Sequence, residues 1–233
     1  MKIIMLFPGY GSQYIGMGKE FYDQSRIMQE YFEEAAICLP INFTKLIFSS
    51  SDNDLKILSN AYPAQFLVSI CLFKILEQEG IIPTHVAGMD IGAYAALFAA
   101  RGISFPDALY LLSKLALSQT TSEAAEQSLA TPSFAMYLQK VDFKDLAIPL
   151  IDSTKNQMIT TANQAHQLIV DGEAMPSSLN HIIDTLAEAD LIIQVGPGTD
   201  LVPKLQKKYP SKTILSCNQP ADLEKIKTII EKL

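Results

Sequence analysis

GMDIG (residues 88–92) lies where a short apolar segment, THVAGM (84–89), meets an alanine-rich one, DIGAYAALFAARG (90–102). The first segment predicts a buried strand and the second a helix. The spacing G-x-D-x-G is that of a nucleophile elbow, a sharp strand-to-helix turn that exposes one reactive side chain at the end of an α/β sheet. Serine is usual at the centre of the motif, but this chain has Asp90. The sequence therefore predicts an α/β sheet with a carboxylate at its elbow.

The rest of the chain alternates between apolar runs and helical segments. Further strands are predicted at KIIMLF (2–7), IPLID (148–152), DLIIQVG (190–196) and KTILSC (212–217). Helices are predicted at 64–80, 105–118, 179–187, 201–209 and 221–233, and in one segment after the glycine loop whose apolar side carries Phe21, Met28, Tyr31, Phe32, Ala35 and Leu39. This alternation predicts an α/β fold with a mainly parallel sheet flanked by helices.

Composition and charge exclude several classes of protein. The 233 residues are 48% hydrophobic and 18% charged, which is typical of a compact globular chain and not of a disordered one. The net charge of −7 argues against nonspecific nucleic-acid binding, because the phosphate backbone would be repelled. One local basic run, KLQKKYPSK (204–212), fits a solvated helix face, with a patch for an acidic partner as the alternative.

The cysteines and the N-terminal segment indicate the compartment. Cys38, Cys71 and Cys217 have no CxxC spacing and lie in apolar segments, as expected of reduced thiols. The apolar run at the N-terminus is too short for a signal peptide, and no stretch approaches the ~18–20 apolar residues of a membrane span. We therefore expect a soluble, cytoplasmic protein with no membrane partner.

Four segments in order resemble the malonyl-CoA:acyl carrier protein transacylases, the acyltransferases of fatty-acid and polyketide biosynthesis. They are LFPGYGSQYIGMG (6–18), the run from AYPAQF to DALYLL (61–112), LQKVDFKDLAIPLIDST (138–154) and LIIQVGPGTDL (191–201). The resemblance implies an α/β-hydrolase-like large subdomain. It also implies a serine nucleophile, a histidine base, two backbone N–H groups that hold the oxyanion, and an arginine that pairs with the malonyl carboxylate.

Transferred position by position, the resemblance gives an unusual site. The serine falls on Asp90, and the histidine that precedes it in the family falls on Met89. The oxyanion-hole positions fall on Tyr10 and Ile91, and neither substitution removes the backbone N–H. The arginine falls on Leu115. Asp90 is thus the candidate catalytic residue, and Met89 and Leu115 are the candidate substrate-pocket positions.

The resemblance also implies that a piece of the family fold is absent. The family has a ferredoxin-like small subdomain and the catalytic histidine between the segments matched here at 105–118 and 138–154. A β-α-β-β-α-β unit needs on the order of 60 residues. The resemblance therefore implies that the subdomain is deleted between about 119 and 137, which leaves 1–233 as one acyltransferase-like α/β domain. An ungapped count places the histidine near Glu123.

The three histidines of the chain do not supply this base. His85 falls within the strand before the elbow, and His166 and His181 fall in later helices at positions that match nothing catalytic in the family. Neither HxxxH nor HExxH spacing occurs, so the sequence predicts no metal and no cofactor.

An aspartate at the elbow leaves three functions open. It can be an N-cap in a protein that has lost catalysis and acts by protein binding, through self-association or on an acyl carrier protein or synthase component. It can be the nucleophile of an acyl transferase or hydrolase. The third function is binding of acyl-CoA without turnover. We favour the first, because a carboxylate at this turn would also repel a malonyl carboxylate, and its oxygen would occupy the oxyanion hole.

Overall fold

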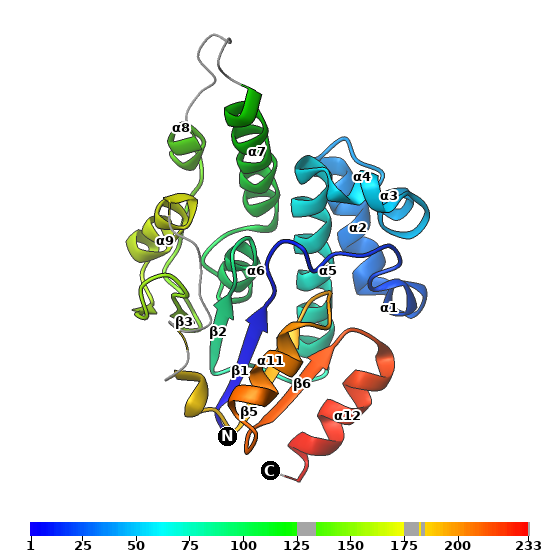
Figure 1. Ribbon diagram of the computed structural model, residues 1–233, viewed down its shortest axis with the longest axis vertical. Coiled ribbons are helices and arrows are strands. Elements are labelled where there is room, and N and C mark those ends of the chain that lie inside the picture. Colours follow the sequence, from blue (N-terminus) through cyan, green and yellow to red (C-terminus); the bar gives the residue numbers. More distant parts are fainter. Residues whose placement is uncertain (125–133, 175–181, 183–184, 233) are drawn as a thin grey trace.

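The computed structural model describes residues 1–124, 134–174, 182 and 185–232. Its described strands form a six-stranded sheet in the order β4-β3-β2-β1-β5-β6 (Figure 1). All neighbours are parallel except β3 and β4, which are antiparallel. The strands are β1 (Ile3–Phe7), β2 (His85–Gly88), β3 (Leu150–Ile151), β4 (Met158–Ile159), β5 (Leu191–Val195) and β6 (Thr213–Cys217). The predicted α/β fold with a mainly parallel sheet is confirmed.

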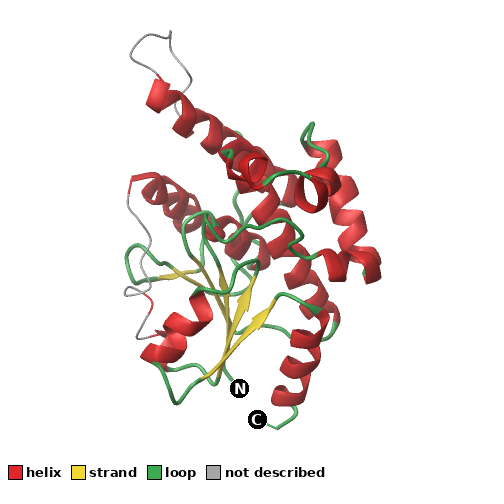
Figure 2. Ribbon diagram, turned by 45° about the vertical axis from the view of Figure 1, so that its right-hand side comes forward, coloured by secondary structure: helices red, strands yellow, loops and turns green. Residues whose placement is uncertain are grey.

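Helices cover both faces of this sheet (Figure 2). Side chains alternate along β1: Ile3 and Met5 join the larger core, which contains most of α5, whereas Ile4 and Leu6 pack with Leu205 of α11 on the other face. The described helices are α1 (Lys19–Gln24), α2 (Arg26–Cys38), α3 (Phe43–Ser49), α4 (Asp52–Lys56), α5 (Leu58–Gln78), α6 (Gly92–Ala99), α7 (Phe105–Ala124), α8 (Phe134–Leu138), α9 (Ala162–Ala174), α11 (Leu201–Lys208) and α12 (Pro220–Ile230).

Several predicted elements have different bounds in the structure. The single helix expected after the glycine loop is wrong, because the chain leaves the helical conformation at Ser25 (φ −108°), which separates α1 from α2 and caps α2 through Oγ and the Met28 N–H (3.4 Å). The helix from Phe105 continues to Ala124, past the predicted end at 118. Most of the helix predicted at 179–187 lies outside the described residues.

The described part of the chain has no helix that is both long and apolar enough to cross a membrane. Among the same residues, no group of three or more His, Cys, Asp or Glu side chains is arranged to hold a metal ion. The three cysteines are free thiols, and burial raises the pKa of Cys71 and Cys217, the latter to about 12.

Candidate functional site

The elbow follows the end of β2 and turns the chain sharply into α6. Asp90 has a positive φ of 51°, a conformation that costs strain for most residues with a side chain. The N–H groups of Gly92, Ala93 and Tyr94 donate to the carbonyls three residues earlier, at 2.8, 3.0 and 3.1 Å. Ile91, not Asp90, is the N-cap position of α6. The expected N-cap role of Asp90 is therefore wrong, since backbone carbonyls already accept from the first turn.

Three glycines allow this turn to touch the loop after β1. A Cβ atom at Gly88 would lie 2.3 Å from the Gly92 carbonyl carbon, and one at Gly92 would lie 2.4 Å from the Phe7 oxygen. A Cβ atom at Gly9 would lie 2.9 Å from the Asp90 Cβ. Real Cβ contacts essentially never come closer than 3.0 Å, so the G-x-D-x-G spacing serves a close crossing of backbones and not only the turn itself.

The two predicted oxyanion positions both donate to the Asp90 side chain. The Tyr10 N–H donates to Asp90 Oδ2 at 3.1 Å. The Ile91 N–H makes a second hydrogen bond to the same carboxylate. The structure therefore brings Tyr10, Asp90 and Ile91 together, although Tyr10 is eighty positions away from Asp90 in the chain.

Asp90 is an exposed residue that lines a cavity, and its carboxylate is partly buried. This burial raises the pKa of Asp90 above its ordinary value of 3.8, and the hydrogen bonds from the Tyr10 and Ile91 N–H groups, which lower the pKa, do not offset it. The same negative charge adds to burial in raising the pKa of Tyr62 to about 12. Asp90 is thus a partly desolvated carboxylate.

The Tyr10 side chain ties the loop after β1 to neighbouring helices. Its hydroxyl donates to the Lys56 carbonyl at the end of α4 (3.1 Å), and its ring lies edge-on to Tyr62 of α5, with centroids 5.5 Å apart. The Tyr62 hydroxyl in turn donates to Gln119 Oε1 of α7 at 2.5 Å. Tyr10 is 41% exposed, so one edge of this bridge faces solvent.

Two buried polar side chains, which the sequence analysis did not identify, fix the backbone of the site by hydrogen bonds. Gln65 Nε2 donates to the carbonyls of Pro8 (2.7 Å) and Gly9 (2.6 Å), which fixes the loop that carries Tyr10. Ser153 Oγ donates to the Gly88 carbonyl at 2.7 Å, which fixes the end of β2. The signal for Gln65 was a polar residue in a helix that is apolar nearly all round.

A cavity of about 520 Å³ opens at the elbow. The loop after β1, the elbow, the turn after β5 and the start of α11 line it. Its lining residues are Pro8, Gly9, Tyr10, Gly11, Ser12, Gln13, Tyr14, Met89, Asp90, Gln194, Gly198, Thr199, Asp200, Leu201 and Lys204.

Of the two predicted substrate-pocket residues, one lines this cavity and the other does not. Met89 lines it, and its role as a substrate-pocket residue stays a prediction. Leu115 does not: its side chain is 6% exposed and packs in the main hydrophobic core. The predicted place of Leu115 in the pocket is therefore wrong. Burial in the core stabilises an apolar side chain of α7 more than contact with a hydrated cavity would.

Neither histidine that the structure describes lies at the elbow. His85 begins β2, so the length of the strand separates it from Asp90, and burial lowers its pKa. His166 of α9 packs edge-on against Phe143, with centroids 5.5 Å apart. Glu123 lies in the last turn of α7, and His181 lies outside the described residues.

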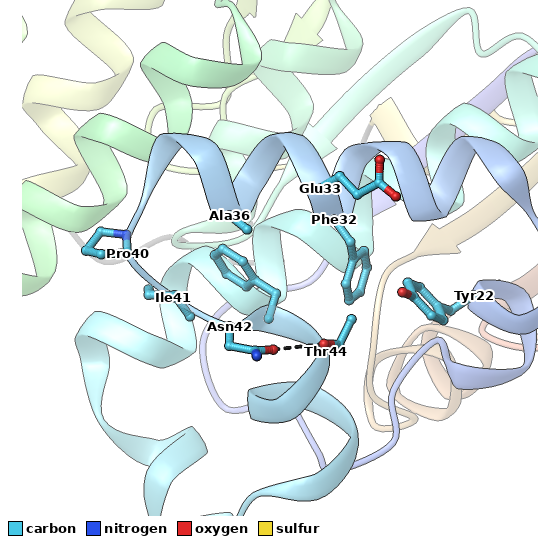
Figure 3. A pocket seen from close by; sticks show the side chains of 9 residues that line it. Tyr22, Phe32, Glu33, Ala36, Pro40, Ile41, Asn42 and Thr44 are labelled. Atoms are coloured by element: carbon cyan, nitrogen blue, oxygen red, sulfur yellow. Dashed lines mark hydrogen bonds between the residues drawn. The ribbon is translucent and has the colours of Figure 1, made fainter.

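A second cavity, of about 400 Å³, lies between α1, α2 and the start of α3 (Figure 3). Aromatic and aliphatic side chains line most of it, among them Tyr22 and Phe32. One of its polar residues, Asn42, caps α3: its Oδ1 accepts from the Lys45 N–H (2.9 Å) and from the Thr44 hydroxyl (2.8 Å). This cavity shares no residue with the one at the elbow.

An elbow at the end of a parallel strand, with two backbone N–H groups beside its central residue, is an arrangement found in α/β proteins that transfer acyl groups. Residues 4–137, more than half of the chain, match the acyl transferase domain family. The chain belongs to this family.

Relatives with similar sequences are named as malonyl CoA-acyl carrier protein transacylases. The chain is 32% identical over 173 residues to the malonyl CoA-acyl carrier protein transacylase of Bacillus subtilis (strain 168), covering 74% of this chain and 54% of that protein. A transacylase of the same name from Synechocystis is 27% identical over 172 residues, covering 74% and 55%. The chain thus spans about half the length of the curated relatives it matches.

Solved structures share the fold. The crystal structure of the Synechocystis malonyl-CoA:ACP transacylase matches with a TM-score of 0.87 at 19% identity, over 97% of this chain and 100% of that one. A malonyl-transacylase solved in complex with a type II PKS acyl-carrier protein matches with a TM-score of 0.86 at 17% identity, over 100% of both chains.

Proposed function

We propose that this acyl transferase family protein binds a partner of acyl transfer without catalysing the transfer. The observation that carries the proposal is the hydrogen bond from the Tyr10 N–H to Asp90 Oδ2 (3.1 Å). A carboxylate oxygen there uses a donor that would otherwise stabilise the oxyanion of a thioester under attack. The Asp90 carboxylate therefore takes the place of the oxyanion that would form in the transition state.

The positions of the histidines that the structure describes support the same proposal. His85 begins the strand whose other end leads to Asp90, and His166 packs on Phe143. In serine hydrolases, loss of the nucleophile or of the base costs about a millionfold in turnover. Even with Asp90 as nucleophile, no described imidazole is placed to activate the acceptor thiol or a water molecule.

We further propose that the family's small subdomain is absent. Residues 125–133 alone separate the end of α7 from the start of α8, whereas a β-α-β-β-α-β unit needs about 60 residues. Its absence leaves Tyr10 (41% exposed) and Ile57 (50% exposed) uncovered on the elbow side. Exposed apolar side chains beside a cavity favour a binding role.

An acyl carrier protein is the partner that the comparisons support. The relatives are named as transacylases of acyl carrier protein, and one structural neighbour is solved in complex with such a carrier. The alternative partners are a second copy of this chain or another synthase component. Sedimentation of the protein alone separates self-association from carrier binding.

The test is an intact-mass measurement after incubation with malonyl-CoA or acetyl-CoA. We expect no acyl adduct on the wild-type protein and no release of CoA above the level seen with Asp90→Ala. An adduct that appears in the wild type and disappears in Asp90→Ala would overturn the proposal.

A second function, acyl transfer or hydrolysis with Asp90 as nucleophile, is favoured by one observation. The carboxylate is exposed to the cavity, so a substrate can reach it. This function predicts burst release of CoA, and it predicts that Asp90→Asn folds but is inactive. Equal activity in Asp90→Asn and wild type would exclude it.

A further inference from the structure

Three charged residues line the elbow cavity. Asp90 lies on the elbow wall, and Asp200 and Lys204 lie on the wall formed by the start of α11. All three are exposed. Two carboxylates and one ammonium give the charged lining an excess of negative charge.

We propose that the cavity binds a phosphopantetheine thioester whose acyl group ends in an ammonium, and that it discriminates against a malonyl group. The ammonium would pair with Asp90, and the phosphate of the pantetheine arm would pair with Lys204. This inference rests on the proposed binding function and names the ligand class of that site.

The acyl end follows from the geometry at Asp90. A carboxylate has about four acceptor positions, and the Tyr10 N–H occupies one of them at Asp90. An ammonium would add charge-assisted hydrogen bonds to an anion that the Tyr10 N–H already orients. A malonyl carboxylate would instead meet a like charge in a partly desolvated site, where repulsion is stronger than in water. Leu115 in the core cannot supply a compensating cation.

The phosphate end follows from Lys204. Its ammonium makes no hydrogen bond or ion pair with the residues that the structure describes, and it shares the cavity with the hydroxyl groups of Ser12 and Thr199. An ammonium beside hydroxyl donors is a suitable site for a phosphate. Asp200 on the same wall opposes an anion, so we expect Lys204 to contribute a moderate part of the affinity.

The test compares CoA thioesters of three acyl groups with the same number of carbons: β-alanyl, propionyl and malonyl, which end in a cation, a methyl group and an anion. Calorimetric titration of the wild-type protein should give affinities in that order, with β-alanyl-CoA at least about tenfold tighter than malonyl-CoA. In Asp90→Asn the three affinities should agree within about twofold, because asparagine tolerates a positive φ and has no charge.

Lys204 is tested with a second pair of ligands and a matched control. Lys204→Gln should weaken binding of all CoA thioesters by a similar factor and leave the pantetheine thioesters, which lack phosphate, unchanged. Lys207→Gln, on the same helix but outside the cavity lining, should change neither. An equal loss for pantetheine thioesters would overturn the phosphate assignment.

The outcomes separate this inference from the proposed function. Malonyl-CoA binding as tightly as β-alanyl-CoA, or no binding of any of the three thioesters, would overturn the inference and leave docking of a carrier protein as proposed. A covalent acyl adduct in the same samples would instead overturn the proposed function, whatever the order of affinities.

Discussion

At the scale of the residue, Asp90 combines three properties that define the site. It has a left-handed backbone conformation, a carboxylate held by two backbone N–H groups, and a raised pKa. The first is a property of the elbow, which needs this conformation whatever the side chain. The second and third follow from the side chain, because only a group with acceptor oxygens at this reach can take the N–H of Tyr10.

The raised pKa of Asp90 predicts how stability depends on pH. Below the ordinary value of 3.8 the group is protonated in both states and has no effect. As pH rises from there through the raised pKa, the folded protein binds more protons than the unfolded one, so Asp90 lowers stability progressively, and the full penalty remains above that pKa. The free energy of unfolding of Asp90→Asn, minus that of wild type, should therefore rise with pH over this window.

Urea unfolding of both proteins at a series of pH values from about 3 to 7 measures this difference. The other titratable groups are common to both proteins and cancel. A difference that is flat or falls with pH would contradict the assignment of burial as the dominant effect on Asp90.

At the scale of the element, the elbow depends on how closely β1, β2 and α6 approach one another. Phe7 pairs with Gly88 in the register of β1 and β2, so the loop after β1 and the elbow leave the sheet at the same edge. The start of α6 then passes against the Phe7 and Pro8 carbonyls, a distance that only glycine permits at position 92.

Gly92→Ala should therefore destabilise the protein by about 3 kcal/mol, since the new methyl group would meet backbone that cannot move freely. Gly172→Ala in α9 is the matched control, because a Cβ atom there meets nothing within 4 Å. This control should stabilise the protein by about 1 kcal/mol through helix propensity. Chemical unfolding of both variants gives the two values, and equal effects would show that the close approach at Gly92 is not important.

At the scale of the whole molecule, α5 runs antiparallel to β2 and connects the two ends of the sheet. Ile57 precedes α5 on the elbow side, where Tyr10 bonds to the neighbouring Lys56 carbonyl, and Ile82 lies in the turn that follows α5. A helix of 21 residues is about 30 Å long. Both isoleucines are 50% exposed, so they report on opposite ends of the protein.

If a carrier protein docks on the elbow side, Ile57→Gln should weaken its binding about tenfold, as expected for an apolar contact in an interface. Ile82→Gln should leave the affinity within about twofold. Titration of a phosphopantetheinylated acyl carrier protein, followed by fluorescence anisotropy, measures both. Equal losses in the two variants would place the docking surface elsewhere.

The elements that the sequence predicted correctly are those whose formation depends on their neighbours in the chain. The strand before the elbow, the turn itself and the helix after it are local, because apolar runs and glycine spacing act within a few residues. The sequence prediction failed at Ser25, where an extended backbone and a side-chain cap divide a pattern that reads as one helix.

What the amino-acid sequence determined on its own is an α/β chain with a carboxylate at the elbow, since hydrophobic periodicity and turn chemistry are written in short segments. What only the tertiary structure decided is which distant groups meet that carboxylate. Tyr10 reaches Asp90 because β1 and β2 pair in parallel. Leu115 lies in the core and not in the cavity, because α7 packs on α5. Contacts of this kind depend on register and packing between elements, which no single segment encodes.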